Sequence, residues 1–112
     1  MSFDPTPNQA AAVSQVFFDR RELDAILRIY GRMVAAGEWR DYAMDALKDA
    51  AVFSVFRRTS EAPLYRIAKR PGLARKQGAY AVLAPGNVVL KRGHELEQVL
   101  KVFDTRRFRV VE

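Results

Sequence analysis

Residues 79–91, AYAVLAPGNVVLK, decide the fold because they predict a β-hairpin. Ala79–Leu83 and Val88–Lys91 are expected to be its strands, and the four residues between them to form the turn. Pro85 fixes the first central position of a type II turn, and Gly86 accepts the positive φ of the second. The second half of the chain is therefore built around an antiparallel pair of strands.

The residues before this hairpin predict three more strands. Ala51–Arg57 is rich in valine and phenylalanine, which favour strands, and Leu64–Lys69 is expected to be the next strand. Trp39–Leu47 fits both a helix and a strand, because its apolar residues recur at both spacings. We favour a strand, since Lys48-Asp49 suits a turn into an antiparallel partner.

A long amphipathic helix is predicted before the sheet. Asp19 is its expected N-cap, Glu22 completes a capping box, and Gly37 ends the helix. Apolar residues recur between these caps at the spacing of one buried face: Leu23, Ile26, Leu27, Tyr30, Met33 and Val34. Because Leu27 belongs to this face, we expect Leu27→Ala to cost about 2 to 5 kcal/mol.

The ends of the chain predict shorter elements. Glu95–Phe103 is expected to be a short helix, Gln15–Phe18 a short strand, and the alternation of Phe108 and Val110 with arginines a final edge strand. Together the elements predict an α+β fold. Its sheet is a mainly antiparallel meander of five to seven strands, with one long N-terminal and one short C-terminal helix packed on one face.

Length and composition indicate one domain. We expect residues 13–112 to form this domain and residues 1–12, which lack apolar periodicity, to form a flexible arm. The chain has no cysteine for a disulfide or a thiolate-bound zinc, and no apolar run long enough to span a bilayer. A signal peptide is not recognisable. We therefore expect a cytoplasmic protein with no membrane partner and no cofactor.

Charge is distributed unevenly along the chain. Residues 1–49 carry 6 basic and 8 acidic side chains, whereas residues 50–112 carry 13 and 5, so the halves bear −2 and +8. Most of the excess lies in residues 57–76, where seven basic side chains oppose only Glu61: Arg57, Arg58, Arg66, Lys69, Arg70, Arg75 and Lys76. If these side chains converge, their guanidinium groups predict a phosphate or carboxylate site. The alternative is that they are scattered over solvated faces.

The residues that usually carry catalysis are sparse. His94 is the only histidine and stands at a helix start, which excludes an HExxH zinc site and favours an ordinary structural role. Asp41, Asp45 and Asp49 form a regular row, but positions four apart on a strand are separated by about 13 Å, which is too far to share a metal. Walker and GxGxxG phosphate loops are absent. The sequence thus predicts a protein that is not an enzyme.

One segment shows a weak likeness to an RNA-binding strand. Lys76–Val82 has a basic residue, a glycine and an aromatic residue in the order seen in RNA-recognition sheets, whose exposed rings stack on bases. The second aromatic residue of that motif is missing. We therefore expect Tyr80 to pack in the core or at an edge.

Four longer segments resemble a known family. They are YGRMVAAGEWRDYAMD at 30–45, AVFSVFRR at 51–58, PLYRIAKRP at 63–71 and LKRGHEL at 90–96. Together they resemble a family of small bacterial single-domain proteins of unknown function, over nearly all of the chain after Val13. The resemblance implies one domain and no particular activity, cofactor or site.

Three hypotheses for function follow from these observations. The first is a non-catalytic binding or adaptor domain that engages nucleic acid or another polyanion through residues 57–76. The second is a protein-interaction module or homodimer that uses an apolar face or a sheet edge. The third is a domain that binds a small ligand in a pocket.

Overall fold

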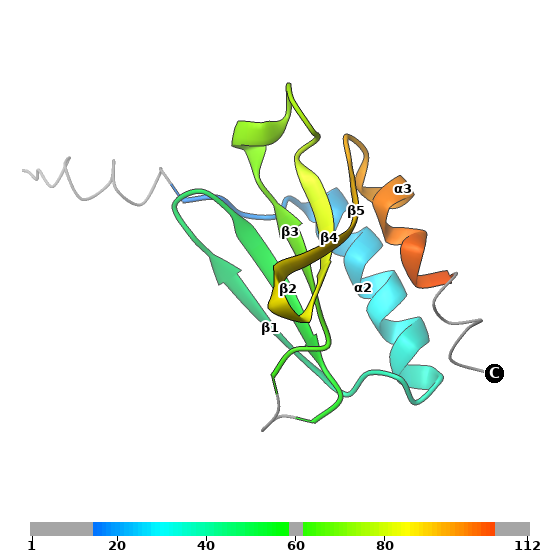
Figure 1. The fold of residues 1–112 in the computed structure, drawn as a ribbon. Helices are drawn as coiled ribbons and strands as arrows, with labels where there is room; N and C mark the ends of the chain where they lie inside the picture. Colours follow the sequence, from blue (N-terminus) through cyan, green and yellow to red (C-terminus); the bar gives the residue numbers. More distant parts are fainter. Residues whose placement is uncertain (1–14, 59–61, 105–112) are drawn as a thin grey trace, which may run out of the picture.

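A computed structural model of the protein describes residues 15–58 and 62–104 and confirms the α+β fold (Figure 1). The strands pair in chain order as a five-stranded antiparallel meander. The elements in sequence are α2 (Arg20–Ala35), β1 (Asp41–Ala46), β2 (Ala51–Phe56), β3 (Tyr65–Lys69), β4 (Tyr80–Ala84), β5 (Val88–Gly93) and α3 (Leu96–Leu100). The arm expected over residues 1–12 and the strand expected around Phe108 and Val110 lie outside these described residues.

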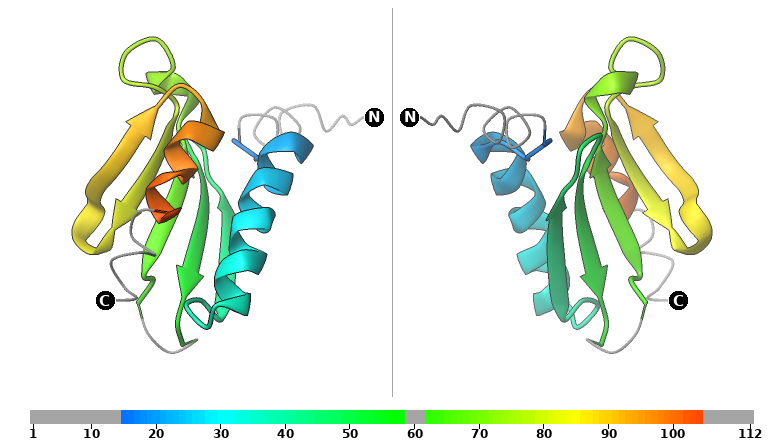
Figure 2. Two further views of the ribbon diagram at one scale, coloured as in Figure 1. Left: turned by 90° about the vertical axis from the view of Figure 1, so that its right-hand side faces the viewer. Right: turned by 90° about the vertical axis from the view of Figure 1, so that its left-hand side faces the viewer.

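Both helices lie against the same face of the sheet, as Figure 2 shows. The strand residues that point toward them form the core, and Phe53, Ile67 and Val82 are fully buried there. They pack against Ile26 of α2 and Val99 of α3. The described residues therefore form two layers, and none of their helices covers the other face of the sheet.

Helix α2 has the ends that the sequence predicts. The Asp19 carboxylate accepts a hydrogen bond from the Glu22 amide (2.8 Å), and the Glu22 carboxylate accepts one from the Asp19 amide (2.7 Å). At the other end Gly37 has a φ of +79°, and the Glu38 amide donates to the Met33 carbonyl. This is a Schellman motif, so caps at both ends fix the position of α2 along the chain.

The buried face of α2 is narrower than the apolar spacing suggested, and the expectation for Leu27 is wrong. Ile26 and Met33 are buried, but Leu27 and Val34 are each 40% exposed. In Figure 2, α2 lies on the β1 side of the sheet, and its flank with Leu27 and Val34 stays open to solvent. Leu27→Ala should therefore cost less than about 1 kcal/mol, which is typical of surface positions.

The hairpins follow the predicted turns. Gly86 has φ 80° and ψ 16°, close to the second central position of a type II turn. The ambiguous stretch around Tyr42 is strand β1, paired with β2 so that Asp41 lies opposite Phe56. The strand expected over Gln15–Phe18 is wrong, because these residues lie outside every strand and the Val16 amide makes a single backbone hydrogen bond, to the Leu47 carbonyl.

Candidate anion-binding site

The seven basic residues predicted as one site lie in separate places. Arg57 and Arg58 follow β2, whereas Arg70 follows β3, whose last residue Lys69 pairs with Ala51 at the start of β2. The two groups are thus at opposite ends of the sheet, about 16 Å apart over a five-residue strand. The sequence segment does not form a single basic patch.

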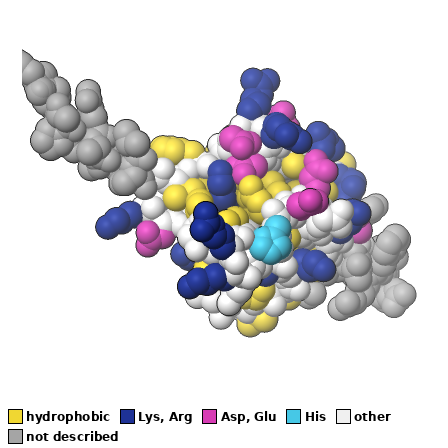
Figure 3. Space-filling model, turned by 90° about the horizontal axis from the view of Figure 1, so that it is seen from above, with side chains coloured by type: hydrophobic (Ala, Val, Ile, Leu, Met, Phe, Trp, Pro, Cys, Tyr) yellow, Lys and Arg dark blue, Asp and Glu magenta, His cyan; other side chains and the backbone are white. Residues whose placement is uncertain are grey.

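The end of the sheet that carries Arg70, Arg75 and Lys76 has mixed charge. Figure 3 looks onto this end and shows Lys and Arg side chains separated by carboxylates and hydrophobic groups. Arg70 lines an open groove of about 510 Å³ together with Lys48 and Asp49 from the β1–β2 turn. The Asp49 carboxylate offsets part of the positive charge of this groove.

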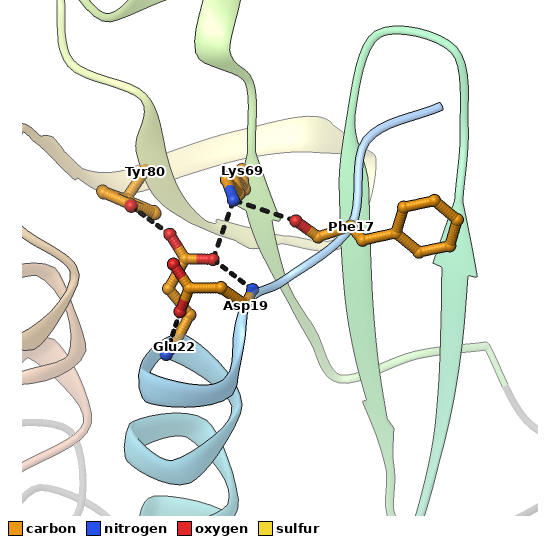
Figure 4. A network of polar contacts seen from close by, with 5 residues as sticks. All are labelled: Phe17, Asp19, Glu22, Lys69 and Tyr80. Atoms are coloured by element: carbon orange, nitrogen blue, oxygen red, sulfur yellow. Dashed lines mark hydrogen bonds and ion pairs between the residues drawn. The ribbon is translucent and has the colours of Figure 1, made fainter. Parts of the chain in front are cut away.

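Lys69 is held by internal contacts instead of facing solvent (Figure 4). Its ammonium group donates to the Glu22 carboxylate at 2.8 Å and to the Phe17 carbonyl at 2.9 Å. The Lys69 side chain is 18% exposed. Lys69 therefore ties β3 to the first turn of α2, and its charge is neutralised by Glu22.

The same carboxylate also binds Tyr80. The Tyr80 hydroxyl donates to the second oxygen of Glu22, which is 8% exposed. The pKa of Tyr80 is raised, mainly because the hydroxyl is removed from water and also because it donates this hydrogen bond to Glu22. Because its ring lies on the helix-covered face, Tyr80 does not offer the exposed stacking surface that an RNA-binding strand needs.

Three arginines converge at the opposite end of the sheet. A pocket of about 450 Å³ is lined there by Arg40, Arg57 and Arg58, together with Trp39, Gly37 and Val34. We call it the arginine pocket. The Arg40 amide donates to the Phe56 carbonyl at 2.7 Å, which holds the start of β1 beside the end of β2. Trp39 is buried and makes an edge-to-face contact with Phe103. One wall of the pocket therefore belongs to the hydrophobic core.

The arginine pocket has an excess of positive charge. Arg57 pairs with the Glu38 carboxylate at 3.6 Å, and Glu38 is the only acidic residue that the structure pairs with any of the three arginines within the described ranges. Three guanidinium groups against one carboxylate leave two positive charges. The C-terminal end of α2 also faces this region, and its dipole stabilises cations placed there. Planar guanidinium groups around a hollow are suited to binding carboxylate or phosphate oxygens.

The sequence identified Arg57 and Arg58 but not Arg40. A β1–β2 turn centred on Lys48-Asp49 places residue 40 opposite residue 57. The predicted strand pairing was therefore enough to bring Arg40 next to Arg57. Counting charges along the sequence missed this neighbour, because Arg40 lies 17 positions before Arg57. Arg66, by contrast, donates a hydrogen bond to the Asn87 side chain at 3.0 Å. It belongs neither to the arginine pocket nor to the basic residues at the other end of the sheet.

The only histidine of the chain does not line the arginine pocket. His94 lies at the edge of an open groove of about 400 Å³ that also contains Glu22 and Tyr80. The described residues contain no group of three or more His, Cys, Asp or Glu side chains that is able to hold a metal ion. Within the same ranges, no helix has the length and apolar character needed to cross a membrane.

Comparison with known proteins identifies the family. A family model described as "Protein of unknown function (DUF2794)" matches residues 16–100, from the segment before α2 to the end of α3. No curated protein and no solved structure matches the chain. The match covers well over half of the 112 residues. The chain therefore belongs to the DUF2794 family of proteins of unknown function.

Proposed function

We propose that this protein is a non-catalytic binding domain that engages an anionic partner through the arginine pocket. The observation that carries the proposal is the convergence of Arg40, Arg57 and Arg58 around one hollow with a single paired carboxylate. Long cationic side chains normally spread apart to stay solvated. Their convergence on one pocket favours a ligand that neutralises them.

The chemistry of the pocket favours phosphate or carboxylate groups on a larger partner. Each guanidinium group donates two parallel hydrogen bonds to such an anion. The pocket is partly open to solvent, so a charged group that projects from a larger partner can enter it. Guanidinium groups that contact phosphates recognise charge and do not distinguish bases. Binding to nucleic acid should therefore be largely independent of nucleotide sequence.

A charge-reversal experiment tests the proposal. The variant Arg40→Glu/Arg58→Glu changes two pocket residues with no side-chain partner recorded in the structure, and Arg75→Glu/Lys76→Glu makes the same change in net charge at the opposite end of the sheet. Fluorescence titrations with heparin, single-stranded RNA and DNA at low salt compare their affinities. We expect the pocket variant to lose at least about tenfold in affinity, and the control variant to lose much less.

Salt dependence provides a second readout of the same site. With about three phosphate contacts, log affinity for a single strand should fall with log salt at a slope near −2, from roughly 0.7 per contact. Glu38→Gln should strengthen binding, because it frees Arg57 from its ion pair. Equal losses in both charge-reversal variants, or no binding to any of the three probes at low salt, would contradict the proposal.

A further inference from the structure

The net charge of the arginine pocket matches a doubly charged anion. Among the described residues, its lining includes Arg40, Arg57 and Arg58 but no carboxylate. Glu38, beside the pocket, pairs with Arg57 at 3.6 Å, which leaves an excess of two positive charges. A phosphate monoester carries about −1.5 to −2 charges at pH 7, whereas a carboxylate or a phosphodiester carries a single negative charge. The pocket is therefore complementary in charge to a phosphate monoester.

The surroundings of the pocket do not continue its positive charge. A chain of phosphates is bound by a row of cations along its path. Along β1 the charged side chains that follow Arg40 are instead Asp41 and Asp45. Arg75 and Lys76 lie at the opposite end of the sheet, beyond β3. The pocket is thus better suited to one highly charged group than to the successive phosphates of a nucleic acid.

Exposed apolar side chains begin at the pocket and continue beside it. Val34 lines the pocket and is 40% exposed, and Leu27, two helical turns earlier on α2, is exposed to the same extent. Tyr30 lies between them and contacts Tyr42 of β1, which is 41% exposed. The Tyr30 hydroxyl donates to the Arg40 carbonyl, which joins this surface to the pocket. We call Leu27, Val34 and Tyr42 the apolar strip.

The apolar strip indicates that the phosphate belongs to a protein. Nucleic acids contact surfaces mainly through phosphates and by stacking on aromatic rings, but Leu27 and Val34 are aliphatic. A protein segment supplies apolar side chains that cover such groups. We propose that the arginine pocket binds the phosphate of a phosphorylated serine or threonine in a partner protein, whose neighbouring apolar residues pack on the strip. This inference rests on the proposed function and specifies its anion.

The size of the apolar strip predicts the sequence around the phosphorylated residue. Leu27 and Val34 are seven residues apart on α2, which is about 10 Å along the helix axis. An extended peptide covers this length in about three residues, and its side chains two positions apart point the same way. The partner should therefore carry a large apolar residue two positions from the phosphorylated residue.

Fluorescence anisotropy with labelled peptides tests the proposal. The probe is a peptide with one central phosphoserine, a leucine two positions to either side and no other charged side chain. Three comparison peptides replace the phosphoserine by serine, replace it by glutamate, or replace both leucines by serine. A short oligonucleotide with a 5′-phosphate, and the same oligonucleotide without it, test nucleic acid as the source of the monoester.

We expect the phosphopeptide to bind at least about tenfold more tightly than the serine and glutamate peptides, because only the phosphate carries close to two charges. Arg40→Gln/Arg58→Gln should abolish this preference. Arg75→Gln/Lys76→Gln removes the same number of charges at the opposite end of the sheet and should retain it. Circular dichroism checks that each variant is folded.

The contribution of the apolar strip has its own readout. The phosphopeptide without leucines should bind at least about threefold more weakly than the probe. Leu27→Ser/Val34→Ser, two changes at exposed positions, should weaken binding of the probe to a similar extent and leave the leucine-free phosphopeptide unaffected.

Equal affinity for the phosphopeptide and the serine peptide would overturn the inference. Tighter binding of the 5′-phosphorylated oligonucleotide than of the phosphopeptide would overturn it as well. Heparin titrations of Arg40→Glu/Arg58→Glu distinguish this failure from failure of the proposed function. If heparin binding is lost in that variant while the peptides are not distinguished, the pocket binds anions but does not select a phosphorylated protein.

Discussion

Glu22→Ala is expected to lower the free energy of unfolding by about 3 to 5 kcal/mol, because it removes one partner of a largely buried ion pair and two further hydrogen bonds. The Glu22 carboxylate accepts hydrogen bonds from Lys69, from the Asp19 amide and from the Tyr80 hydroxyl. Its loss leaves the Lys69 ammonium partly buried without its carboxylate and removes half of the capping box. Urea denaturation followed by circular dichroism measures the effect.

A control and a double-mutant cycle separate these contributions. Asp24→Ala removes an exposed carboxylate from the same helix, where the ion pair with Arg20 is at 4.0 Å, and should cost less than about 1 kcal/mol. Lys69→Met removes the buried charge, so Glu22→Ala should cost less in that background. If the costs of Glu22→Ala and Lys69→Met simply add, the ion pair is not what joins α2 to β3.

The second large effect is expected at Phe53. This side chain is fully buried at the centre of β2, where it contacts Tyr30 and Tyr42. Phe53→Ala should therefore cost about 3 to 5 kcal/mol through lost burial and a cavity. Leu27→Ala, from the exposed flank of α2, is the matched comparison and should cost less than about 1 kcal/mol. Equal effects in denaturant melts would mean that α2 is rotated relative to its described position.

The sequence predicted most of the fold because its signals were local. The Asp19–Glu22 capping box, the Gly37 cap and the Pro85-Gly86 turn each depend on residues only a few positions apart. Tyr42 and its neighbours remained ambiguous until pairing with β2 placed them in a strand. Periodicity alone does not separate a short helix from a strand.

The candidate site was less predictable because it depends on contacts across the sheet. Linear charge counting grouped Arg57 with Lys76, although the meander places them at opposite ends, and it omitted Arg40, which the strand register brings to Arg57. Lys69 was counted as a free cation, but Glu22 from α2 neutralises it. Leu27 had the right spacing for the core, yet its flank of α2 is open to solvent, and spacing alone does not show how far a sheet extends beneath a helix.

NMR spectroscopy can locate the anion-binding site on the protein. Amide NMR spectra of the ¹⁵N-labelled protein, recorded during titration with a short heparin oligosaccharide, report which residues the anion contacts. We expect saturable shifts at the amides of Gly37, Arg40, Arg57 and Arg58, which line the arginine pocket. Shifts centred on residues 70–76, or no shifts at low salt, would contradict it.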